Sequence, residues 1–162
     1  MKRKIALVLF VVLGLSAALG IHRYVITKDY SGWNHIVDPA RIKFEMDYPD
    51  FLTFGWQWDM YQDGSKIYNV TFGEEVQIAS APGSEDDLRS LLSFSSEPII
   101  YSSKIKIDGY DAIKINDPIY DKRVPPSYTV YFLANGRLYR IHFLKPELGH
   151  DKRMLESFRV IK

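Results

Sequence analysis

Two histidines and two acidic residues form the densest group of possible metal ligands. His142, Glu147, His150 and Asp151 lie in one short stretch, but their spacing matches no standard zinc pattern. On a strand, His142 would share a face with Arg140. We interpret His142 as a solvated strand residue and the others as loop and helix-start residues. His142 and His150 remain the candidate metal ligands, and we expect no cofactor.

Aromatic residues form a second candidate site. Trp56 and Trp58 are two positions apart, so on a strand they share one face with Phe54, and Tyr61 lies close by. An exposed aromatic face stacks against sugars, peptides or bases, whereas the same face under a helix belongs to the core. We name Trp56, Trp58 and Tyr61 as candidate ligand-binding residues, although core packing is the commoner role for aromatic residues on a strand.

No sequence motif indicates catalysis. The chain lacks the Gly-x-Ser-x-Gly pattern, and its serines at 84, 90, 93, 95 and 96 are typical of helix caps and helix ends. The acidic run Glu85-Asp86-Asp87 suits the first turn of a helix. A Ser–His–Asp triad is a spatial arrangement that sequence does not test. We therefore assign no catalytic residue.

Composition narrows the possible classes of function. The net charge is +1, and Lys2, Arg3 and Lys4 contribute three positive charges at the N-terminus, so the rest of the chain is close to neutral. A near-neutral body has no electrostatic reason to bind nucleic acid. The chain contains 0 cysteines, which excludes disulfides and thiolate ligands. The chain has 162 residues, of which 46% are hydrophobic, so it can bury the core of one domain.

The N-terminal segment indicates export. Residues 5–21 carry no charge and span roughly 25 Å as a helix, against about 30 Å for the hydrocarbon core of a bilayer. The basic flank stays cytoplasmic, which places the remainder of the chain outside. Small residues around Ala18 suit cleavage, while the His22-Arg23-Tyr24 border suits an anchor. Residues 1–21 are therefore either a signal peptide or a membrane anchor.

Alternating hydrophobicity and turn residues predict the elements of the first half. We expect residues 22–40 to form a juxtamembrane spacer with little fixed structure. Strands are expected over 42–46 and 54–61, and over 67–72 and 75–79, the last two being one strand if Gly73 forms a bulge. Ser84 and Asp87 resemble a capping box and predict a helix over 85–94.

Two hairpins dominate the second half. Asp108-Gly109 joins strands over 99–107 and 110–115, and Asn135-Gly136 joins strands over 128–133 and 137–144. A proline-containing loop occupies 117–126. A helix over 151–158 and a strand over 159–161 follow. We expect Phe158 to be buried, with Met154 and Leu155 facing the sheet.

This order of elements resembles the PsbP-like family, the relatives of the photosystem extrinsic protein. The resemblance rests on Tyr48-Pro49 after a strand, Ser84 before a helix, and two hairpins, followed by Leu155-Glu156-Ser157-Phe158 and a last strand. It covers residues 41–162. It implies an α+β fold, with an antiparallel sheet flanked by helices in an α/β/α sandwich, and a non-enzymatic, secreted or membrane-tethered protein. No chloroplast transit peptide precedes the domain, so we expect no photosystem role.

Two functions follow as alternatives. The first is an extracytoplasmic binding or accessory domain, held at the membrane or secreted, whose partner is an envelope or membrane protein. The second is a small extracytoplasmic hydrolase. A cleft in which His142 faces an acidic residue would favour the hydrolase.

Overall fold

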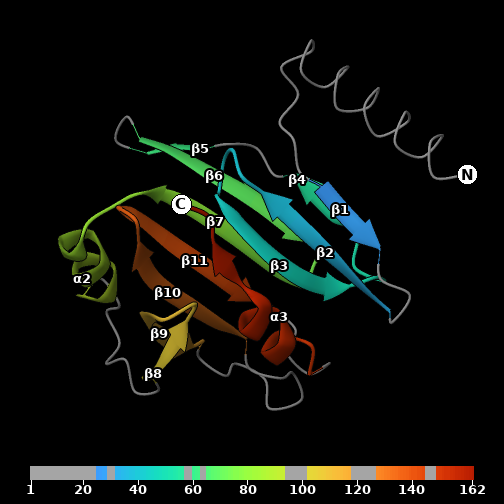
Figure 1. The fold of residues 1–162 in the computed structure, drawn as a ribbon. Coiled ribbons are helices and arrows are strands. Elements are labelled where there is room, and N and C mark those ends of the chain that lie inside the picture. The colour runs from blue at the N-terminus through green and yellow to red at the C-terminus, as the bar shows by residue number, and fades with distance from the viewer. Residues whose placement is uncertain are drawn as a thin grey trace, which may run out of the picture.

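In the part of the chain that the structure describes, the fold is mostly antiparallel β-sheet with two short helices (Figure 1). The computed structural model describes residues 25–28, 32–56, 60–62, 65–93, 102–117, 127–144 and 149–162. The N-terminal segment that we interpret as a signal peptide or anchor lies outside these ranges. Within them, neither helix has the length and hydropathy needed to cross a membrane.

The smaller sheet joins parts of the chain that are far apart in sequence. Its strands run in the order β1-β2-β3-β12, all antiparallel. They are β1 (Val25–Lys28), β2 (Trp33–Asp38), β3 (Phe44–Pro49) and β12 (Arg159–Val160). The predicted strands at 42–46 and 159–161 are therefore both present, and they pair with each other.

The expectation that residues 22–40 have little fixed structure is wrong, because β1 and β2 lie within that range. The inward positions of β2 are Asn34, Ile36 and Asp38, so two of the three are polar and the hydrophobic alternation is hidden. Asp38 tolerates burial because its carboxylate accepts hydrogen bonds from the backbone N–H groups of residues 40, 41 and 42.

The larger sheet has the strand order β4-β6-β7-β11-β10-β9-β8, and β5 also pairs with β6. Its strands are β4 (Phe54–Trp56), β5 (Met60–Gln62), β6 (Ser65–Phe72), β7 (Val76–Pro82), β8 (Ser102–Ile107), β9 (Tyr110–Asn116), β10 (Tyr128–Ala134) and β11 (Arg137–Phe143). All the pairings are antiparallel.

The hairpin turns follow their sequence signals. Asp108 and Gly109 have φ values of 50° and 83°, and Asn135 and Gly136 have 51° and 71°. Positive φ at both central residues is the mark of the type I′ turn, so both hairpin predictions are confirmed. Gly73, with φ 58°, lies in the turn between β6 and β7 and not in a bulge within one strand.

Both helices begin at the residues that the sequence predicts. In α2 (Glu85–Ser93), the Ser84 N–H donates to the Asp87 carboxylate at 2.7 Å, and the Asp87 N–H donates to Ser84 Oγ at 3.3 Å. This reciprocal pair confirms the capping box. The second helix, α3 (Asp151–Ser157), buries Met154 and leads directly into β12.

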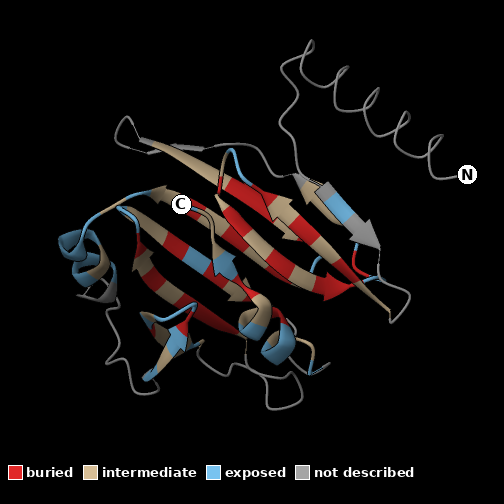
Figure 2. Cartoon of the chain, viewed as in Figure 1, coloured by how far each residue is buried: buried red, intermediate tan, exposed pale blue. Residues whose placement is uncertain are grey.

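The core lies between the two sheets. Figure 2 shows buried positions alternating along the strands of both sheets, with exposed residues on the helices and turns. Tyr48 of the small sheet contacts Phe72 of the large one, with ring centroids 4.9 Å apart. Phe158 is fully buried, as predicted. The resemblance implied one sheet flanked by helices, whereas here the strands of residues 25–49 build a second sheet that covers the inner face of the first.

Candidate functional site

The predicted aromatic site falls largely outside the described residues. Trp58 is not described, and of Trp56 and Tyr61 only the backbone is, in β4 and β5 respectively. Trp56 pairs with Val70, and Met60 pairs with Ile67. The two registers differ by one residue, so the single regular strand expected over 54–61 is two strands. The alternation that placed Trp56 and Trp58 on one face stays a prediction.

The candidate metal ligands have separate partners. His142 contacts Asp117, and Asp151 accepts a hydrogen bond from the Tyr128 hydroxyl. His150 packs against the rings of Trp33 and Phe51, with centroids 5.6 and 5.2 Å away. Glu147 lies outside the described residues. Among the residues that the structure does describe, no three His, Asp or Glu side chains are grouped to hold a metal ion.

Ser127, Asp117 and His142 form a group that sequence reasoning missed. The Ser127 hydroxyl donates to Asp117 Oδ2, and His142 Nε2 lies 3.2 Å from the same oxygen. The Asp117 N–H also donates to the Ser127 carbonyl at 2.9 Å. Asp117 is the first residue of the loop predicted at 117–126 and Ser127 follows its last residue, so a clue lay in two polar residues at the ends of a proline-containing stretch.

The order of these hydrogen bonds differs from that of a catalytic triad. In a triad, histidine lies between the nucleophile and the carboxylate. Here the carboxylate lies between serine and histidine. Arg140 Nη2, which can only donate, lies 3.3 Å from His142 Nδ1, so this network assigns the ring proton to Nε2, which donates to Asp117. Both ring nitrogens are therefore occupied, and neither is placed to take the Ser127 proton.

A second group surrounds Arg137 at the start of β11. Arg137 Nε donates to Ser80 Oγ at 2.8 Å, and its guanidinium carbon lies 5.8 Å from the centroid of the Tyr68 ring. The Lys66 ammonium approaches the same ring at 4.9 Å. Ser80 is buried, with 1% of its surface exposed. We call Arg137, Ser80, Tyr68 and Lys66 the Arg137 site.

Tyr139 connects the Arg137 site to the small sheet. Its hydroxyl donates to the Ile42 carbonyl at 2.9 Å. Burial raises the pKa of Tyr139, and Arg137 nearby partly offsets that rise. The hydroxyl therefore stays protonated at neutral pH and fixes the position of β11, which carries Arg137, against the segment that precedes β3.

A third group lies at the N-terminal end of α3. The Arg153 guanidinium lies over the Trp33 ring, 4.1 Å from its centroid, and also pairs with Asp47 at 3.3 Å. His35 Nδ1 contacts the other oxygen of that carboxylate at 2.9 Å. The charges here are paired within the group, so it serves to dock α3 on β3.

No family model matches this chain, and no curated protein has detectable similarity to it.

Proposed function

We propose that this protein is a non-enzymatic binding or accessory domain that works outside the cytoplasmic membrane, either anchored or secreted. The uncharged run over residues 5–21 behind Lys2-Arg3-Lys4 supports export. Its partner is an envelope or membrane protein. The hairpins at 108–109 and 135–136, the capped α2 and the closing α3–β12 unit support the further proposal that the domain is related to the PsbP-like family, with the sheet of residues 25–49 as a departure from the expected α/β/α sandwich.

The observation that carries binding over catalysis is the order Ser127–Asp117–His142. The Ser127 hydroxyl, Asp117 Oδ2 and both ring nitrogens of His142 already have hydrogen-bond partners. A serine nucleophile needs a free base nitrogen within reach, and His142 offers none. We assign the group a structural role, in which it joins the two ends of the loop after β9 and ties them to β11.

A hydrolase is the second candidate, because His142 does face an acidic residue, as a catalytic histidine would. Rotation of the imidazole away from Arg140 would free one nitrogen, and apo hydrogen bonds at catalytic sites are often imperfectly aligned. The side chain of His142 is only 15% exposed, however, and the hydrogen bond to Asp117 holds it in place. We therefore rank this function below binding.

One set of fusions and variants tests the proposal. Alkaline phosphatase fused after Lys162 should be active, whereas a cytoplasmic reporter fused there should be inactive. The purified full chain should hydrolyse neither nitrophenyl esters nor peptide amides. If turnover appears and is lost in both Ser127→Ala and His142→Gln, the hydrolase is the correct function. Loss of cooperative unfolding in the same variants, with no turnover in the wild type, supports the structural role.

A further inference from the structure

Arg137 has a buried donor with no partner. Its Nε is bonded to Ser80, but its Nη2 is inaccessible to solvent and has no hydrogen-bond acceptor. Arg137 also forms no salt bridge with any carboxylate in the described part of the chain. An unpaired guanidinium N–H held away from water is costly, and Arg cannot lose its charge to reduce that cost. The guanidinium also interacts with the Tyr139 hydroxyl, so the capacity left for a further acceptor is that of Nη2 alone.

The ion-paired arginines provide the contrast to Arg137. Arg89 pairs with Glu85, Arg153 with Asp47, and Arg159 with Asp108. Each of these lies at a partly or largely exposed position, where pairing is worth little. Arg137, which is more deeply placed and would gain most from a counter-charge, has none among the described residues.

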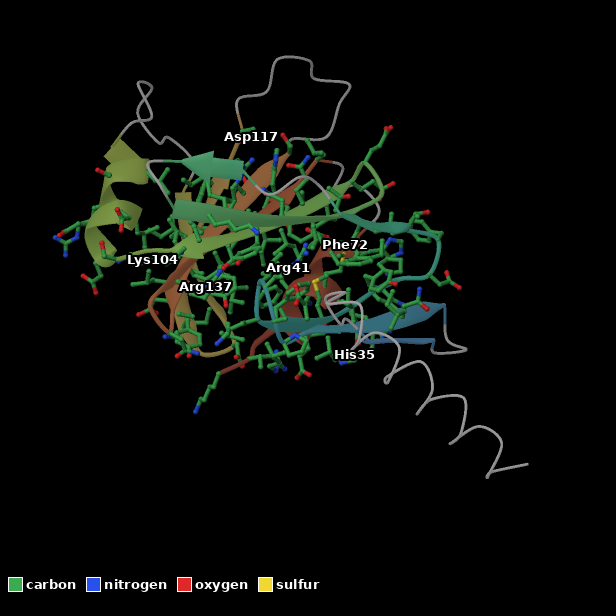
Figure 3. All side chains as sticks on the ribbon, turned by 90° about the horizontal axis from the view of Figure 1, so that it is seen from above. His35, Arg41, Phe72, Lys104, Asp117 and Arg137 are labelled. Atoms are coloured by element: carbon green, nitrogen blue, oxygen red, sulfur yellow. The ribbon has the colours of Figure 1, made fainter. Side chains whose placement is uncertain are left out.

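The surroundings of Arg137 are positive and polar. Lys66 and Arg137 approach the same Tyr68 ring, so two cations meet at one aromatic side chain. Figure 3 shows Arg41 and Arg137 between the level of β6 and that of β2 and β3. The permanent charge of Arg137 itself would attract a negative group here, and burial strengthens that attraction relative to water.

We infer that Arg137 binds an oxyanion, a carboxylate or a phosphate, carried by the ligand of this domain. The guanidinium presents N–H donors that match both groups, and Nη2 is the donor left unused by Ser80. Arg137 as a whole is only half-buried, so part of its side chain already reaches solvent. This inference deepens the proposed binding function and depends on it.

The test measures thermal unfolding of the full chain with sodium phosphate, sodium succinate or sodium chloride at equal ionic strength. We expect phosphate or succinate to raise the Tm by about 3–6 °C at tenfold excess over its Kd, and chloride to have no comparable effect. Arg137→Met should abolish the rise. Arg140→Met, on the opposite face of the same strand, should retain it.

Each outcome identifies or overturns the site. A rise with phosphate alone identifies a phosphate ligand, and a rise with succinate alone identifies a carboxylate. Arg137→Lys keeps the positive charge but loses the planar guanidinium with its paired N–H donors. This variant should weaken the apparent affinity for the anion about tenfold, and it remains informative if Arg137→Met does not fold. Equal behaviour of all three salts, or a rise that survives in Arg137→Met, overturns the inference. If the chain is nevertheless exported and crosslinks to an envelope protein, the proposed function survives that failure.

Discussion

Two regions between the sheets differ in what they do with their side chains. Around Phe158 the contacts are aromatic and complete: its ring stacks on Phe44 at 5.3 Å and meets Phe132 and Tyr139 edge-on. Around Arg137 the contacts are polar and incomplete, since one guanidinium nitrogen has no acceptor. The difference fits a division of roles in which the first region supplies stability and the second supplies the anion site proposed above.

Phe158→Ala should have the largest effect. Phe158 contacts one strand of the small sheet and two of the large sheet, so its removal leaves a cavity where the sheets meet. We expect a loss of about 3–5 kcal/mol in the free energy of unfolding. Urea denaturation measures it, with Phe51→Ala as an exposed aromatic control. A loss below about 1 kcal/mol would show that α3 does not dock as described.

Tyr128→Phe tests how α3 is held. The Tyr128 hydroxyl donates to Asp151, the first residue of α3, so its loss should cost about 1.5–2 kcal/mol at neutral pH. Burial, and then the Asp151 carboxylate, raise the pKa of Tyr128 above its usual value of 10.0. Its contribution is therefore present below pH 10 and is lost as the pH rises further. Wild-type stability should fall more steeply above pH 10 than that of Tyr128→Phe, and parallel profiles would refute the bond.

Gly136→Val probes the turn that precedes Arg137. A side chain at Gly136 would meet no atom within 4 Å, so the cost comes from its φ of 71° alone. We expect a loss of about 1–2 kcal/mol. Gly109→Val, in the other type I′ turn and also in open space, is the matched comparison. A neutral Gly136→Val would mean that the hairpin tolerates another turn.

Arg137→Met tests whether the Arg137 site contributes less to stability than the region around Phe158. Removing a poorly satisfied buried cation should change the stability of the ligand-free chain by less than about 1 kcal/mol, despite the burial of the site. Denaturation without phosphate or carboxylate buffers measures it. A loss as large as that of Phe158→Ala would place the Arg137 site among the stabilising contacts and remove the distinction between the two regions.

Lys104→Ala and Lys106→Ala should have the smallest effects. Both residues are exposed on β8, and the Lys106–Asp111 ion pair is formed by largely exposed side chains. Each change should stay within about 0.5 kcal/mol. A larger effect on unfolding in dilute salt that vanishes in concentrated salt would reveal an electrostatic role for this edge strand.

Local signals predicted most of the elements, because the residues that determine them are neighbours in sequence. Asn135-Gly136 determines its turn, and Ser84 with Asp87 caps its helix within one turn of chain. The strand β2 was missed because two of its three inward positions, Asn34 and Asp38, are polar, and Asp38 is satisfied only by backbone N–H groups of the folded turn that follows. The break between β4 and β5 depends on pairing with β6, which alternation within a strand does not reveal.

The site residues were harder to predict for the same reason. Arg137 and Ser80 are brought together by the pairing of β11 with β7, across 57 positions of sequence. The first residue of a strand after an Asn-Gly turn is usually solvated, so nothing in the sequence around Arg137 predicted that this side chain would be partly buried. Ser127 was overlooked because no motif surrounds it, and its role depends on a histidine from another strand.

The pairing of β12 with β3 determines when the domain can fold. Residues 159 and 160 add to the edge of a strand made more than a hundred positions earlier, and Phe158 enters the core beside them. Such distant contacts make folding slow and late. A chain cut before Phe158 lacks the side chain that joins the sheets, so it should remain open to proteases. We therefore expect the chain to become protease-resistant only once residues 158–160 have joined the two sheets.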